Sequence, residues 1–88
     1  MKTETKIQLI QRSIDTIQAL IDYAVEHDTK QTMLKVYVDM FNNNTALINK
    51  LKDSDALSLM EEAMVSGICE AELKMLLAEA GTTERASA

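Results

Sequence analysis

The sequence predicts an all-α protein, with two long antiparallel helices followed by a short C-terminal helical hairpin in a bundle-like arrangement. Two observations support this fold class. The 88 residues include no proline and only two glycines, although 47% of them are hydrophobic. A sheet protein would contain more turn residues and more aromatic residues. In addition, apolar residues recur at alternating spacings of three and four over long stretches, which is the period of an α-helix.

The first helix follows the clearest of these apolar patterns, an a/d seam of three heptads. Thr5 and Gln8 match a capping box at its start, with Thr3 as an alternative cap. The pattern ends near His27, and Asp28 is the predicted cap of the next helix. We expect the seam to pair two copies of the chain. This predicted dimer seam consists of Ile7, Ile10, Ile14, Ile17 and Ile21, together with Asn44 from the second helix.

The second helix is predicted near residues 29–52, where two apolar stripes run side by side. Three consecutive asparagines, residues 42–44, could instead form a loop, because asparagine is a poor helix former. The apolar pattern keeps its phase across them, since Phe41 and Ile48 are seven residues apart. One continuous helix therefore explains the pattern better. Asn44 then either fixes the register of the seam or lies at its rim in contact with water.

The C-terminal hairpin is predicted to consist of two short helices. Caps are available at Asp53, Ser54 and Asp55, and Gly67 would end the first short helix in a left-handed turn. The second would run from about Cys69 to Ala80. The sequence thus predicts one helical domain over residues 1–80 and a disordered tail over residues 81–88.

A chain of this length is near the lower limit for a stable core without further support. Its single cysteine forms no internal disulfide, and its single histidine leaves no Cys/His zinc site. We therefore expect a homodimer. No segment approaches the length of a membrane span, and the N-terminus does not resemble a signal peptide. With an unpaired cysteine, this predicts a cytoplasmic protein without a membrane contact.

Residues 63–76 have the spacing of a helix-turn-helix motif, with Ala63 followed four residues later by Gly67. A DNA-binding regulator using residues 59–80 is therefore one interpretation. However, this segment contains five glutamates and a single lysine, Lys74. Phosphate contacts need cations, so the charge argues against nucleic acid as a partner. Helix packing explains the spacing better.

Enzymatic chemistry finds no support in the sequence. The acidic pairs Glu61/Glu62 and Glu70/Glu72 do not converge on one point of a helix, so they indicate a solvated acidic face. His27 lies at a helix C-terminus, where the dipole favours a cation. Cys69 has no nearby base in the sequence. We expect no enzyme, no catalytic residues, no cofactor and no metal.

The prediction for function is a small acidic protein-binding module: a regulator, adaptor or inhibitor. Residues 53–88 carry a net charge of −6, from eight acidic and two basic residues. The acidic side chains would steer this segment to a basic surface on another protein, while methionines and other apolar residues anchor it. A second alternative is a structural protein that only forms homo-oligomers. The predicted partner-binding residues are Met60, Glu61, Glu62, Met64, Glu70, Ala71, Lys74, Met75 and Ala78.

Overall fold

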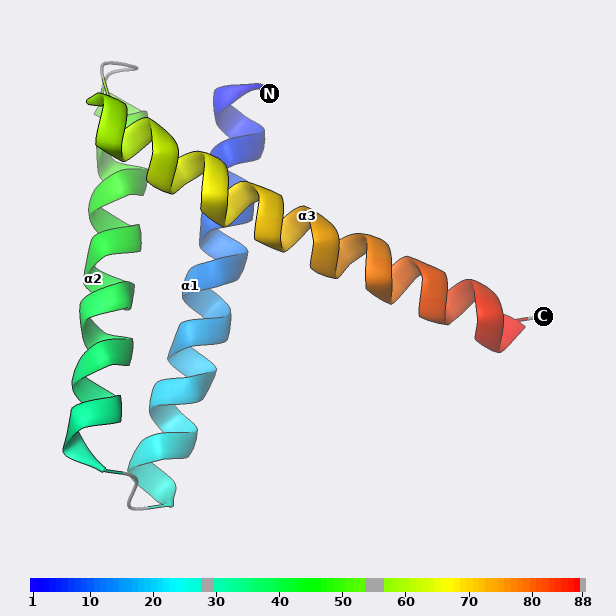
Figure 1. Ribbon diagram of the computed structural model, residues 1–88, viewed down its shortest axis with the longest axis horizontal. Coiled ribbons are helices and arrows are strands. Elements are labelled where there is room, and N and C mark those ends of the chain that lie inside the picture. The colour runs from blue at the N-terminus through cyan, green and yellow to red at the C-terminus, as the bar shows by residue number, and fades with distance from the viewer. Residues whose placement is uncertain (28–29, 54–56, 88) are drawn as a thin grey trace.

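Three helices make up the part of the chain that the computed structural model describes, which is residues 1–27, 30–53 and 57–87, with side chains as far as Gly81. They are α1 (Thr3–Glu26), α2 (Gln31–Asp53) and α3 (Leu59–Ser87). Figure 1 shows α1 and α2 side by side and running in opposite directions, as predicted. The third helix crosses this pair near the N-terminus of α1 and the C-terminus of α2, and then continues beyond it.

The core lies where all three helices meet. The a/d pattern of α1 supplies its centre: Ile10 is fully buried, and Ile14 is buried beside it. From α2 come Leu47, Ile48 and Leu51, at the three- and four-residue spacings of one helix face. The α3 helix adds residues between positions 65 and 76. Its contribution consists of the buried Val65 and Cys69, with Ile68 and Leu76 packed against them.

The three asparagines lie inside α2, which confirms the prediction of one continuous helix. Asn44 is buried, and its Nδ2 donates a hydrogen bond of 3.0 Å to Ser13 Oγ on α1. A buried amide needs such a partner, because an unsatisfied donor costs free energy. Of the two roles considered for Asn44, the rim position in contact with water is therefore wrong. Within this chain, Asn44 pairs α2 with α1.

The predicted hairpin is wrong, because a single helix occupies its place. There is no turn at Gly67, and the helix ends at Ser87 rather than at Gly81. The φ angle of Gly67 lies outside the left-handed region that a helix-ending glycine adopts. One glycine inside a helix costs only about 1 kcal/mol relative to alanine. The alanines, methionines and glutamates around Gly67 favour the helix, and the turn does not form. The division into a domain over residues 1–80 and a tail over 81–88 stays a prediction.

The helix starts also differ in part from those expected. Lys2 takes the N-cap position of α1 with no side-chain cap, so the proposed Thr5–Gln8 capping box is wrong. At the start of α3, Ser58 and Glu61 form the capping box. The Glu61 amide donates to Ser58 Oγ at 3.2 Å, and the Ser58 amide donates to Glu61 Oε1 at 3.0 Å. The predicted caps Asp28, Ser54 and Asp55 lie outside the described residues.

The arrangement of the helices is flat and extended. Its principal extents are 44 × 38 × 17 Å, so the shortest one is about two helix layers. The radius of gyration is 15.1 Å. A compact domain of this length would have a value of about 12 Å. The difference arises because the C-terminal half of α3 leaves the α1–α2 pair instead of folding back on it (Figure 1).

Candidate protein-binding surface of α3

One narrow face of α3 holds it to the rest of the chain. Val65, Cys69, Glu72 and Leu76 follow one another at spacings of four, three and four, and so lie on one side of the helix. The first three are buried and Leu76 is half-buried. A helix in a compact domain buries a broader stripe than this. Most of the circumference of α3 therefore faces solvent.

Large apolar side chains occupy much of that exposed circumference. Leu59 is 86% exposed, Met60 75% and Leu77 73%. Met64, Leu73 and Met75 are also exposed, although each keeps part of its surface against the helix or its neighbours. Single exposed apolar residues are ordinary, but this many large ones along one helix indicate a surface that binds something.

The predicted partner-binding residues do not all share one side of α3. Helical spacing places Met60, Met64, Ala71 and Met75 along one side, and Ala78 continues that line. All five are exposed. Lys74 lies further round the helix and pairs with Glu70, 3.6 Å away at the i,i+4 spacing. Both ends of this ion pair are well exposed, so it contributes little stability.

Glu61 is committed to interactions within the chain. Its Oε2 lies 2.6 Å from Lys50 Nζ on α2, and its other oxygen accepts the capping hydrogen bond from Ser58. These bonds, with Lys50 as the largest cause, lower the pKa of Glu61 from 4.5 to about 2. The carboxylate therefore caps the N-terminus of α3 and also links it to the end of α2 through Lys50. A role in steering a partner would require it to give up these bonds.

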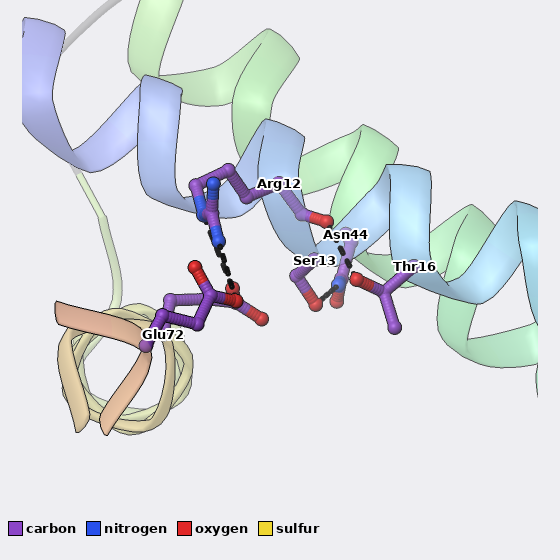
Figure 2. Close-up of polar contacts among 6 residues, drawn as sticks. Arg12, Ser13, Thr16, Asn44 and Glu72 are labelled. Atoms are coloured by element: carbon purple, nitrogen blue, oxygen red, sulfur yellow. Dashed lines mark hydrogen bonds and ion pairs between the residues drawn. The ribbon is translucent and has the colours of Figure 1, made fainter. Parts of the chain in front are cut away.

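Glu72 is buried, although its sequence context indicated a solvated acidic face. Figure 2 shows it reaching from α3 towards Arg12 on α1. The Arg12 Nε lies 3.6 Å from Glu72 Oε2, and Arg12 Nη2 lies 3.7 Å from Glu79 Oε1. One guanidinium thus contacts α3 at two points. Glu72 shares a helix face with Val65 and Cys69, and this spacing indicates burial. The acidic residues nearby in the sequence suggested exposure instead.

A groove of about 540 Å³ opens between the N-terminus of α1 and the first half of α3. Its apolar part includes Val65 and Cys69, which are also core residues. Burial raises the pKa of the Cys69 thiol, an effect that Lys6 opposes in part. The thiol is therefore not poised as a nucleophile. Residues of α1 and α3, Leu51 of α2, and Met1 and Leu57 next to the helices line the groove. The full lining is Met1, Thr3, Lys6, Leu51, Leu57, Glu62, Val65, Ser66, Cys69, Glu70 and Leu73.

The predicted dimer seam is used inside a single chain. Ile10, Ile14 and Ile17 are buried without a second copy, and Ile7 and Ile21 are half-buried. Asn44, the polar member of the seam, is bonded to Ser13 of the same chain. A dimer would thus have to use other residues.

At the opposite end of the α1–α2 pair, the position of His27 agrees with the sequence prediction. It takes the C-cap position of α1, and its backbone N–H donates to the Tyr23 carbonyl at 3.0 Å. The ring of His27 stacks on that of Tyr23, with centroids 3.9 Å apart. The structure thus gives His27 a role in ending the helix.

The geometry of residues 59–80 is not that of a helix-turn-helix motif, because they form one straight element without a turn. None of the described helices is long and apolar enough to cross a membrane. Among the described residues, no three His, Cys, Asp or Glu side chains lie together as metal ligands would. Comparisons with protein-family models, curated proteins and solved structures find no match. The function has to be argued from the surface of this chain alone.

Proposed function

We propose that this protein is a small helical protein-binding module, which docks onto another protein through the exposed side of α3. The observation that carries the proposal is the exposure of Leu59, Met60 and Leu77 on a helix that leaves the rest of the chain. Large side chains of this kind form the anchors of protein interfaces, and methionine adapts to irregular partner surfaces.

The total accessible surface area of the chain supports an interface with another protein. The accessible surface is 6514 Å². A monomer of 9.8 kDa ordinarily exposes about 5,200 Å². The excess of about 1,300 Å² is larger than the roughly 800 Å² that one partner contributes to an interface of standard size. The chain thus has enough additional exposed surface to form its side of a standard-size interface.

The charge on α3 favours a partner with a basic surface. Glu62 and Glu70 are exposed and line the groove beside α3, where Leu57 and Leu73 offer apolar contacts. A partner that inserts an apolar side chain between flanking lysines or arginines would match this arrangement. Glu72 is buried and Glu61 holds short bonds to Lys50 and Ser58, whereas the ion pair of Glu70 with Lys74 is well exposed and weak. The steering charge therefore comes from Glu62 and Glu70 rather than from all four.

A capture experiment with paired variants tests the proposal. The double variant Met60→Ser, Leu77→Ser removes two anchors from α3, and both side chains are exposed, so the helix should remain folded. The matched control is Val25→Ser on α1, since Val25 is 65% exposed and lies on another helix. Proteins retained by the native chain in host extract would be quantified by mass spectrometry and compared between the variants.

We expect a protein that the native chain and Val25→Ser retain, and that the double variant loses. A charge-reversed variant, Glu62→Lys with Glu70→Lys, should slow capture and make it less sensitive to salt. Equal retention by the native chain and the double variant, both helical by circular dichroism, would refute docking through α3.

A further inference from the structure

A second apolar surface lies on the α1–α2 pair, on the side where α3 crosses. The α3 helix covers only one end of that side (Figure 1). Beyond it, Figure 2 shows Ser13, Asn44 and Thr16 on the side of the pair that faces α3. Helical spacing extends this side along each helix, from Ser13 through Thr16 to the next turns of α1, and from Asn44 back along α2. We call this surface the open face: Ser13, Thr16 and Leu20 of α1, and Met33, Val36, Met40 and Asn44 of α2.

The open face carries no charged side chain, and four of its seven residues are large and apolar. Leu20, Met33, Val36 and Met40 are all exposed on it. Asn44 Nδ2 donates to Ser13 Oγ, and Thr16 Oγ1 donates to the Arg12 carbonyl, so part of the polar surface of the face is already bonded within the chain. Covering the face therefore removes mainly apolar side chains from water.

We propose that the open face is the dimer interface of this protein, covered in solution by the open face of a second copy. An antiparallel two-helix layer that packs on an equal layer makes a four-helix bundle, and each chain supplies one such layer. The chain has a net charge of −5, so two copies repel each other over most of their surface. In a two-fold dimer the same patch of each copy is in contact. If that patch is uncharged, no like charges meet in the interface.

The size of the open face agrees with a reversible dimer. From Ser13 to Glu26, α1 extends about 21 Å beyond the crossing of α3, and two helices side by side are about 20 Å wide. The product of this length and width is about 400 Å² per copy and about 800 Å² for both. It treats the face as flat and leaves out the additional area of protruding side chains. This area is smaller than the roughly 1,000 Å² at which specific interfaces begin, so we expect a weak dimer with a dissociation constant in the high micromolar range. This inference goes beyond the proposed function, because it uses no anchor residue of α3.

Two valines on α2 provide a matched test. Val36 lies on the open face and is 46% exposed, whereas Val38, two residues later and on the other side of the helix, is 39% exposed. The variants Val36→Glu and Val38→Glu thus make the same chemical change on the same helix. Sedimentation equilibrium over a range from micromolar to millimolar would measure dimerisation of the native chain and of both variants.

We expect the native chain and Val38→Glu to dimerise with similar constants, and Val36→Glu to dimerise about 100-fold more weakly or not at all, since its charge would be buried without a partner. If Val36→Glu loses helicity by circular dichroism, Met40→Lys on the same face replaces it. A native chain that stays monomeric, or a Val36→Glu dimer as strong as the native one, would overturn the proposal. So would equal loss in both variants. Partner capture through α3 is measured separately and can fail or succeed independently of this result.

Discussion

Replacing Gly67 with alanine should stabilise the protein, and the sign of the effect distinguishes the continuous α3 from a hairpin. Gly67 is exposed in the interior of α3, and nothing lies within 4 Å of the position that a Cβ would take. Alanine therefore meets no steric obstacle. It also gives up less backbone entropy on folding than glycine, which is worth about 0.5–1 kcal/mol inside a helix.

For a domain of this size, that gain raises the melting temperature by about 2–8 °C. Thermal and urea unfolding, followed by circular dichroism at one fixed protein concentration, would measure it. Ala63→Gly, one turn earlier on the same exposed side, makes the reverse change and should lower stability by a similar amount. This variant measures how much an alanine–glycine exchange changes the free energy of unfolding in this part of α3.

A hairpin would give the opposite result for Gly67→Ala. A helix-ending glycine adopts the left-handed conformation, in which a Cβ costs about 1–2 kcal/mol per residue. A lower melting temperature for Gly67→Ala, together with the expected loss for Ala63→Gly, would show that our account of α3 is incorrect.

Three further predictions concern the polar and titratable groups. The pKa of Glu61 is lowered from 4.5 to about 2, so its stabilising effect is complete above about pH 4.5 and is lost as the pH falls towards 2. The stability difference between the native chain and Glu61→Gln should accordingly shrink in unfolding experiments between about pH 6 and pH 2.5, and a constant difference would contradict the assigned bonds. Ser13→Ala leaves the buried Asn44 amide without its partner and should cost about 1–3 kcal/mol. Adding Asn44→Leu should recover most of that loss in urea unfolding, because both polar partners are then gone. Finally, the buried Cys69 thiol, whose pKa is raised, should react slowly with Ellman's reagent near pH 8 in the native state and quickly after unfolding. Rapid reaction of the native chain would show that the thiol is accessible.

The sequence was sufficient to predict α1 and α2, because their core residues follow a strict helical period. The same period runs across the asparagines of α2, since Phe41 and Ile48 remain in phase on either side of them. Periodicity also identified the residues that α1 buries. It did not identify what buries them, and the isoleucines of the predicted dimer seam pack against helices of their own chain.

The C-terminal region was predicted less well because a local signal was given too much weight. Gly67 matches the end of a helix, but glycine is also tolerated inside one when the flanking residues favour the helix. The capping box of Ser58 and Glu61 was readable in the sequence and would have placed the start of α3 correctly.

Ion pairs between helices could not have been predicted from the sequence. Arg12 and Glu72 are far apart in the chain, and only the crossing of α3 over α1 brings them together. The same holds for Lys50 and Glu61. Of the three most exposed apolar residues of α3, the sequence analysis named Met60 but missed Leu59 and Leu77. The separation of acidic residues into bonded and exposed ones also depended on the three-dimensional arrangement.

The contacts at the crossing of α3 determine where its far end lies. Beyond Glu72 the helix continues to Ser87, a length of about 22 Å, and Arg12 holds it through Glu72 and Glu79. Over that length, a rotation of about 10° at the crossing displaces the last turn by about 4 Å. A small rotation at the crossing therefore moves the far end of α3 by several ångströms, so the packing at the crossing sets how far the molecule reaches.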